Sequence, residues 1–388
     1  MANNYASHFG INNIPYGIAS SSSRPEPQHV TRIGDEVIFL AEIADLDLFT
    51  AVSAPLSSVF REKTLNTFAA LSKDVQSQIR SAIQQAYKAG AHKDHSESIE
   101  RVDMHLPVQI GDFTDYSASA NHVLNAGEAI IGVRAFPPAF QKYPVGYAGR
   151  CSSIAVSGTP IVFGACRALD YELEIGAIVG KPVKARTHLN AKDADEHIFG
   201  LVLVNDWSAR DIQGLEMNPL GPFNGKNFIT SISPWIVTLE ALKPHEVPAP
   251  ERMQPVADFL NDPAGINYDI QLEATITRNG SQTSTCKVGF ETMYWTFRHM
   301  FAHHTIGGCA LRTGDLIASG TVSGEEEHQH GCLLELTKNG KAASKLSDGS
   351  ELRYLEDEDE VRYTAVIGDG SAGIGFGECV GVVKPARK

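Results

Sequence analysis

Short strand-like segments follow one another from about residue 106 onwards, and this pattern restricts the fold more than any other feature of the sequence. The segments are rich in Val, Ile, Leu and Thr, and one clear helix is expected among them, near residues 291–304. A parallel wound sheet needs a helix after most strands, so the pattern favours a mixed, β-rich domain. The expected strands cover residues 169–179, 197–205, 234–239, 268–277, 315–319, 332–337, 361–366 and 378–383.

The first 105 residues are expected to form a domain of their own. A chain of 388 residues exceeds the size at which one hydrophobic core keeps growing, so we expect two domains, over residues 1–105 and 106–388. In the first domain, residues 32–40 are predicted to form a hairpin and residues 73–89 a helix with apolar side chains at every fourth position. No reactive side chains converge there, so the chemistry is expected in the second domain.

A regular alternation of side chains runs from Leu169 to Ile175. The apolar residues stand at odd positions and the acids at even ones, which predicts a strand with one buried face and one acidic face. Glu172 and Glu174 then point the same way, with Cα atoms roughly 7 Å apart. Two such carboxylates repel each other unless a cation lies between them, and a hard divalent metal takes oxygen ligands. Taken alone, the alternation is also typical of an acidic face exposed to solvent.

A second acidic group follows the continuous apolar run of residues 197–205, which predicts a fully buried strand. If the next residues turn helical, Asp206, Arg210 and Gln213 lie on one stripe of the helix. A carboxylate, a guanidinium and an amide would then face the same space. Two simpler interpretations are a helix cap for Asp206 and a surface ion pair for Arg210.

Asp115 and His122 repeat this arrangement on another segment. They are seven residues apart, so a two-turn helix would place both on one side. An acid that can bind a metal would then lie beside an imidazole that can move a proton.

The bulk composition excludes several classes of function. The formal net charge of −13 argues against a nucleic-acid partner, which needs clustered Lys and Arg. We find no apolar run that could span a membrane and no signal-peptide pattern, so a cytoplasmic protein without membrane contact is expected. The six cysteines contain no Cys-x-x-Cys pair and are predicted to be free thiols. Residues 368–373 match G-x-G-x-x-G, but glycines instead of a helix follow, so no nucleotide site is expected.

Several sequence blocks, spread over nearly the whole chain, carry a more specific pattern. They are Met104–Pro107, Ile110–Asp115, Pro144–Tyr147, Leu169–Glu174, Asn205–Gln213, Pro219–Phe223 with Gly225-Lys226, and Ala318–Thr321. Together they resemble the fumarylacetoacetate hydrolase family, which acts in tyrosine breakdown. The resemblance implies a small N-terminal SH3-like barrel domain, a larger C-terminal β-roll catalytic domain and a homodimer.

The resemblance also implies roles for individual residues. It implies a divalent metal, Mg²⁺ or Ca²⁺, held by Asp115, Glu172, Glu174 and Asp206. It implies a His122–Glu335 pair as the base that activates water, with Arg210, Gln213 and Lys226 stabilising negative charge. The substrate-binding positions would be Ser117, Ile131, Tyr147, Arg210, Gln213 and Thr321.

Two of these positions depart from the family pattern. Ser117 stands where the family has a Tyr, and Ile131 where it has an Arg. An Arg can bind a carboxylate through two hydrogen bonds, so its loss changes recognition of the far end of the substrate. Arg134 is close enough in sequence to replace it.

The function implied is cleavage of a carbon–carbon bond in a 1,3-diketo acid, with fumarylacetoacetate giving fumarate and acetoacetate. One alternative keeps the fold and metal but acts on another 2,4-dioxo or 2-oxo acid, as a hydrolase, decarboxylase or isomerase in a side pathway. Another is an inactive ligand-binding relative, against which the intact His122 argues.

Overall fold

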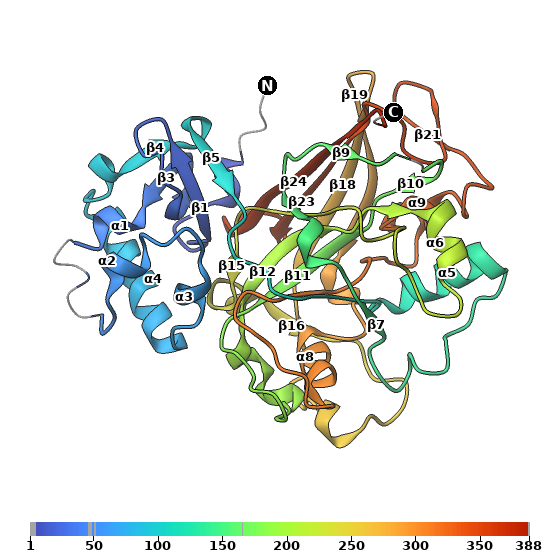
Figure 1. Cartoon of the computed structure of the whole chain (residues 1–388), viewed down its shortest axis with the longest axis horizontal. Helices are drawn as coiled ribbons and strands as arrows, with labels where there is room; N and C mark the ends of the chain where they lie inside the picture. Colours follow the sequence, from blue (N-terminus) through green and yellow to red (C-terminus); the bar gives the residue numbers. More distant parts are fainter. Residues whose placement is uncertain (1–4, 46–48, 50–51, 165, 387–388) are drawn as a thin grey trace.

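The computed structural model describes residues 5–386, except 46–48, 50–51 and 165. Figure 1 shows a smaller part formed by the N-terminal residues, in blue, and a larger part formed by the rest of the chain. Both parts are built mainly on sheets, which confirms the expected mixed, β-rich class. Among the described residues, no helix is long and apolar enough to cross a membrane.

The N-terminal part is an open half-barrel of five antiparallel strands in the order β4-β3-β2-β1-β5. The expected hairpin joins β2 to β3, and Gly34 turns it with a φ of 61°, which favours glycine. The expected helix is α4, which begins after Ser72. The strands are β1 (Tyr16–Ser21), β2 (Gln28–Ile33), β3 (Glu36–Phe39), β4 (Ser96–Ser98) and β5 (Val102–His105), and the helices are α1 (Leu40–Ile43), α2 (Leu56–Val59), α3 (Asn66–Ala69) and α4 (Lys73–Lys88).

Two larger sheets form the C-terminal part. The first has the order β7-β6-β20-β11-β12-β14-β8, with β15 also paired to β12, and the second has the order β19-β18-β23-β24-β9. The first contains β6 (Phe113–Tyr116), β7 (Gly146–Ala148), β8 (Ile154–Val156), β11 (Leu173–Val179), β12 (Ile198–Asn205), β14 (Thr230–Ile232), β15 (Val237–Thr238) and β20 (Leu316–Ala318). The second contains β9 (Ile161–Val162), β18 (Ile270–Arg278), β19 (Ser281–Gly289), β23 (Glu360–Ile367) and β24 (Gly375–Lys384).

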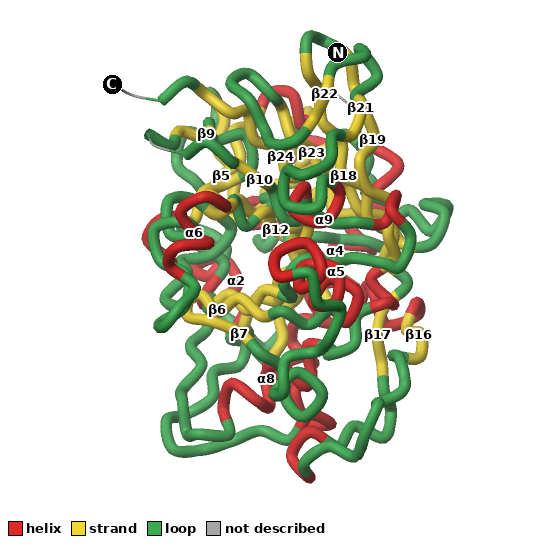
Figure 2. Tube along the Cα trace, turned by 90° about the vertical axis from the view of Figure 1, so that its right-hand side faces the viewer, coloured by secondary structure: helices red, strands yellow, loops and turns green. Residues whose placement is uncertain are grey.

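Short ladders and helices complete this part. The two-stranded ladders pair β10 (Leu169–Asp170) with β13 (Ser208–Ala209), β16 (Glu246–Pro248) with β17 (Ile266–Tyr268), and β21 (Ser344–Lys345) with β22 (Glu351–Leu352). The helices are α5 (Ala120–Ile131), α6 (Arg210–Glu216), α7 (Leu239–Leu242), α8 (Phe297–Thr305) and α9 (Leu333–Leu336). Figure 2 looks onto the face on which α5, α6 and α9 lie.

The central strand β12 is buried on both faces. Leu203 belongs to the core between the two large sheets, whereas Val204 belongs to the core shared with the N-terminal part. Phe199 meets Phe68 of α3 with ring centroids 5.5 Å apart. This double burial explains why the β12 sequence is a continuous apolar run instead of an alternating one.

The strand predicted over residues 169–179 is interrupted, and its acids do not face solvent. Tyr171 and Glu172 separate β10 from β11. Asp170, Glu172 and Glu174 are all at most 5% exposed. The solvent-exposed interpretation of this acidic face is therefore wrong.

Within the strand predicted over residues 332–337, Leu333–Leu336 instead form the helical turn α9, and only Cys332 makes a β-bridge, with Glu172. An apolar run as short as Leu333–Leu336 does not distinguish strand from helix by periodicity. The turn forms because the first amides of α9 donate to the carboxylate of Asp170. The strand predicted at 234–239 shortens to β15, and the helix predicted near 291–304 begins only at Phe297, after a capping box at Thr296.

Candidate active site

Four buried carboxylates come together where several strands end. One oxygen from each of Asp115, Glu172, Glu174 and Asp206 lies within 4.8 Å of the others. Asp115 lies in β6, Glu174 in β11 and Asp206 directly after β12, while Glu172 lies between β10 and β11. The order of strands in the first sheet brings these positions together, although they are up to 91 residues apart.

The electrostatics of this cluster favour a bound cation. Burial and the neighbouring carboxylates raise the pKa of Asp115 and Glu174 well above the usual carboxyl range. Both oxygens of Glu174 and Oδ1 of Asp115 are buried and lack a hydrogen-bond partner among the described residues. Such oxygens are costly to bury unpaired. The cluster therefore fits a hard divalent cation such as Mg²⁺ or Ca²⁺.

Lys226 neutralises one side of the cluster. Its Nζ lies 2.6 Å from Oε2 of Glu172 and 2.7 Å from Oδ2 of Asp206. Burial alone would lower the pKa of Lys226, but Asp206 and Glu172 raise it above the usual value. Asp206 also accepts hydrogen bonds from Tyr147, at 2.6 Å, and from Thr230, at 2.8 Å. Lys226 is therefore a permanent positive charge at the edge of the acids.

His122 and Glu335 form a close pair beside the acids. Nδ1 of His122 lies 2.7 Å from Oε1 of Glu335, and among the described residues Nε2 has no partner. Ser323 and Asn125 donate to the two oxygens of Glu335, at 2.7 and 2.8 Å. Burial would raise the pKa of Glu335, but His122 and these hydrogen bonds hold it below the usual value. A charged Glu335 fixes the imidazole with Nε2 free to accept a proton.

The route that brings His122 to the acids differs from the predicted one. The two-turn helix over residues 115–122 is wrong, because Asp115 lies in β6 and α5 begins only after Ser119. The Oγ of Ser119 accepts a hydrogen bond from the His122 amide, as expected of a helix cap. Burial would raise the pKa of Glu172, but the nearby charges of Lys226, Arg210 and His122 lower it, so His122 lies near this acid.

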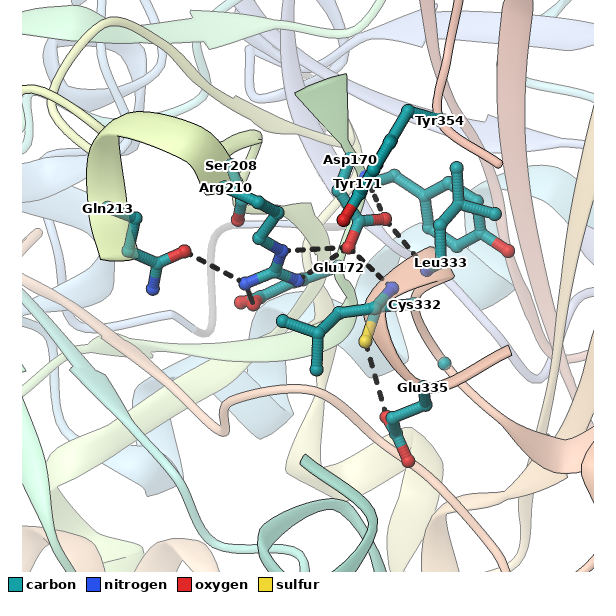
Figure 3. A network of polar contacts seen from close by, with 12 residues as sticks. Asp170, Tyr171, Glu172, Ser208, Arg210, Gln213, Cys332, Leu333, Glu335 and Tyr354 are labelled. Carbon is teal, nitrogen blue, oxygen red and sulfur yellow. Dashed lines mark hydrogen bonds and ion pairs between the residues drawn. The ribbon is translucent and has the colours of Figure 1, made fainter. Parts of the chain in front are cut away.

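Arg210 and Gln213 line another wall of the site (Figure 3). The single helical stripe predicted for Asp206, Arg210 and Gln213 is wrong, because α6 begins at Arg210. Arg210 still meets Gln213, with Nη1 3.0 Å from Oε1. The same Nη1 lies 2.8 Å from Oε1 of Glu172. Asp170 holds the other edge of the guanidinium, where Nε donates to Oδ2 at 2.8 Å.

Sequence comparison gives the family. A sequence model described as "Fumarylacetoacetase N-terminal" matches residues 12–107, and one described as "Fumarylacetoacetate (FAA) hydrolase C-terminal" matches residues 112–384. The chain belongs to the fumarylacetoacetase family.

Similar proteins support the same assignment over nearly the full length of the chain. A fumarylacetoacetase of Bos taurus is 41% identical over 409 residues, covering 98% of this chain and 97% of the relative. One of Arabidopsis thaliana is 38% identical over 407 residues, covering 98% and 96%. Among solved structures, a fumarylacetoacetate hydrolase from Exiguobacterium antarcticum has a TM-score of 0.56 at 19% identity, covering 96% of this chain and 99% of that one. At that identity the likeness concerns the fold.

The predicted substrate-binding positions of this fumarylacetoacetase family member differ in burial and in their contact with the acids. Tyr147 contacts the acids through Asp206, and the buried Oγ1 of Thr321 has no hydrogen-bond partner among the described residues. Ser117 is half-buried directly after β6. Ile131, the last residue of α5, is 71% exposed and is not buried with the others. Arg134 donates to Oδ1 of Asn125 at 2.6 Å, and Asn125 in turn donates to Glu335.

Sequence reasoning missed several polar residues that hold the site together. Asp170 alternates with apolar residues in the same way as Glu172 and Glu174. The sequence pattern therefore placed it on the acidic face, but no role was predicted for it. Asn125 lies three residues after His122, on the same side of α5. Ser323 and Thr230 gave no signal, because isolated hydroxyl residues are common throughout the sequence.

Proposed function

We propose that this protein is a metal-dependent hydrolase that cleaves fumarylacetoacetate into fumarate and acetoacetate. The observation that carries the proposal is the buried acid cluster beside the His122–Glu335 pair. It occurs in a chain about 40% identical to fumarylacetoacetases over 98% of its length, namely 38% to 41% in the relatives above.

Hydrolysis between two carbonyl groups needs an activated water and two places for negative charge. Nε2 of His122 takes a proton from water, and Glu335 stabilises the imidazolium that results. The hydroxyl adds to the acyl carbon, the carbon–carbon bond breaks, and its electron pair leaves with the enolate of acetoacetate. The imidazolium returns a proton to that carbanion, so the protons balance.

Polar side chains beside the acids stabilise the developing negative charge. Arg210, Gln213 and Lys226 offer N–H donors on one side of the acids. Buried donors act strongly there because little water competes with them. Asp115, Glu172, Glu174 and Asp206 would hold Mg²⁺ or Ca²⁺, which when bound supplies a Lewis acid for the oxygens of the diketo acid.

Turnover of a panel of diketo acids tests the function. The purified protein is incubated with fumarylacetoacetate, with neutral acyl analogues and with other 2,4-dioxo acids, in the presence of Mg²⁺ or Ca²⁺. We expect release of fumarate and acetoacetate. Turnover of another acid at the expense of fumarylacetoacetate would favour the alternative in which the same site serves a different 2-oxo acid, and binding without turnover would favour the inactive relative.

Ser117 and Ile131 give a specific prediction about the acyl end of the substrate. If these residues leave its carboxylate without a charged partner, S117Y together with I131R should raise kcat/KM for fumarylacetoacetate, relative to a neutral analogue, by about tenfold. R134A is the matched control, because Arg134 is the nearby cation. If R134A lowers that ratio and the double change leaves it unaltered, Arg134 holds the carboxylate and our interpretation of the two departures is wrong.

We also propose a homodimer formed through the face that carries α5 and α6 (Figure 2). Apolar side chains are exposed on α5, on α6 and in the residues that follow each helix, and exposed apolar surface of this kind is typical of a protein interface. They are Ile130, Ile131, Val133, Leu215, Met217, Leu220 and Phe223.

Aspartate substitution tests this interface. L215D combined with L220D should convert the dimer to a monomer in light scattering after gel filtration, because buried charges oppose association. I306D is the control, since Ile306 is also exposed but follows α8. A double variant that remains dimeric would place the interface elsewhere.

Two further features belong to the proposal. We place the domain boundary between residues 105 and 106, which is supported by the end of β5 at His105 and by the family match that ends at residue 107. We also propose that the protein acts in the cytoplasm.

A further inference from the structure

Asp170 is completely buried in the wall of the site and contacts only donors (Figure 3). Oδ1 accepts from the amides of Leu333, at 2.7 Å, and Tyr171, at 2.8 Å. Oδ2 accepts from the Leu334 amide at 2.9 Å and from Nε of Arg210 at 2.8 Å. Nη2 of Arg210 also lies 2.7 Å from Oδ2. Among the described residues, every hydrogen-bond partner of Asp170 is a donor.

These contacts join two parts of the site that are remote in sequence. Leu333 and Leu334 are the first residues of α9, whose amides have no partner within the helix. Glu335 follows directly, and its carboxylate meets His122. Asp170 therefore fixes the start of the turn that carries Glu335, 163 residues away in sequence from Leu333.

The same carboxylate fixes Arg210. The β10–β13 ladder pairs Asp170 with Ser208. Arg210 follows two residues later, as the first residue of α6. With Nε and Nη2 turned to Asp170, only Nη1 is directed to Glu172 and Gln213. Asp170 therefore orients the guanidinium of Arg210, so that Nη1 points toward Glu172.

We propose that Asp170 is a positioning residue that holds Arg210 and Glu335 in fixed relation, so that the charge-stabilising side and the proton-accepting side of the site are aligned. Among the described residues, its polar contacts do not include the four acids of the cluster, and it acts through the two residues it holds. The proposal rests on the proposed function only for its kinetic consequence. The geometric consequence, a displaced Glu335, does not depend on the substrate.

D170N is the first test. The amide group replaces one acceptor oxygen with a donor, which must then face either Arg210 or the amides of α9, and both are donors. We expect kcat to fall by about 10²-fold, as for small misplacements of catalytic groups. Mg²⁺ or Ca²⁺ should still bind, measured by calorimetry, because the four acids are unchanged.

A proton signal reports the geometry without any substrate. The Nδ1 proton of His122, hydrogen-bonded to Glu335 at 2.7 Å, should give a downfield ¹H NMR resonance that H122A removes. We expect D170N to shift or broaden this resonance. A purely structural role for Asp170 would lower the melting temperature and leave the resonance and kcat unchanged.

D359N is the matched control. Asp359 is also buried and accepts from Arg278, whose Nε and Nη2 lie 2.8 and 2.7 Å from its oxygens, and from the Glu356 amide at 2.8 Å. Its side-chain contacts among the described residues lead to Arg278 and Glu356, neither of which belongs to the candidate site. D359N should lower the melting temperature as D170N does, without moving the His122 resonance.

A second variant covers the case in which D170N does not fold. D170N with R210Q removes the charges of Asp170 and Arg210 together, and Glu172 keeps Lys226 as its partner, so the double variant should fold where the single change fails. Compared with R210Q alone, the double variant should still displace the His122 resonance, because α9 has lost its anchor. An unmoved resonance in this pair overturns the proposal. Absence of turnover in the unaltered protein would instead count against the proposed function, and the resonance would remain a valid test.

Discussion

Replacing His122 with alanine is expected to lower kcat by about 10² to 10⁴, the usual contribution of a general base. His122 has a free Nε2 and a charged partner on Nδ1, and no other imidazole within the described residues is paired with a carboxylate beside the acids. The variant should stay folded, because Ser323 and Asn125 still donate to Glu335, and it should keep its affinity for Mg²⁺ or Ca²⁺, because His122 is outside the acid cluster. A kcat within about threefold of the unaltered protein would exclude His122 as the base.

Glu335 should act through His122, and this is testable by combination. E335Q removes the charge that stabilises the imidazolium and replaces an acceptor of the His122, Ser323 and Asn125 hydrogen bonds. We expect a loss in the same direction as for H122A. Because the two residues form one unit, H122A with E335Q should cost much less than the product of the single losses. Multiplicative losses would mean that they work independently.

Removal of the divalent metal is expected to abolish turnover, and Mg²⁺ or Ca²⁺ should restore it. Four buried carboxylates in one cluster with unpaired oxygens are the reason. E174Q removes a ligand without changing the shape of the side chain, and should weaken metal binding in calorimetry. E273Q is the control, since Glu273 lies on β18 outside the cluster. Full activity after chelation, checked by metal analysis, would contradict the proposed metal.

The raised pKa values of Asp115 and Glu174 fix the sign of a pH effect on the metal-free protein. A carboxyl with a raised pKa keeps its proton in the folded state at a pH where the unfolded chain has lost it. The folded state then binds more protons, so the free energy of unfolding falls as pH rises from the ordinary carboxyl range to the raised pKa. Melting temperatures measured in chelator should therefore fall over that interval relative to those of E174Q, a comparison that cancels the opposite effect of buried histidines with lowered pKa values.

Metal binding should reverse this trend. The ion displaces the protons of Asp115 and Glu174, so its affinity should rise with pH, and calorimetry in buffers of different ionisation enthalpy should detect released protons. A binding reaction that releases no proton would mean that these acids are already ionised, or that the ion binds elsewhere.

Family membership and the residues of the acid cluster could be predicted from the sequence, because they depend on local blocks. The acids, His122 and the Asp206–Gln213 block stand in fixed order along the chain, and their chemistry is independent of how they are brought together. The helix α4 and the hairpin at Gly34 could be predicted because a cap, a stripe and a left-handed turn are short-range features.

The routes that bring these residues together were decided only by the tertiary structure. The helices predicted for residues 115–122 and 206–213 followed from spacing alone, but the strand β6 and the β10–β13 ladder take up part of each segment. Residues 333–336 become helical because Asp170, far away in sequence, accepts hydrogen bonds from the first two amides of the turn, those of Leu333 and Leu334. Burial of the acids is likewise a tertiary effect, since alternation shows that two faces differ but not what covers each face. The sequence by itself determined which groups do the chemistry, whereas long-range pairing and burial determined their distances, charges and partners.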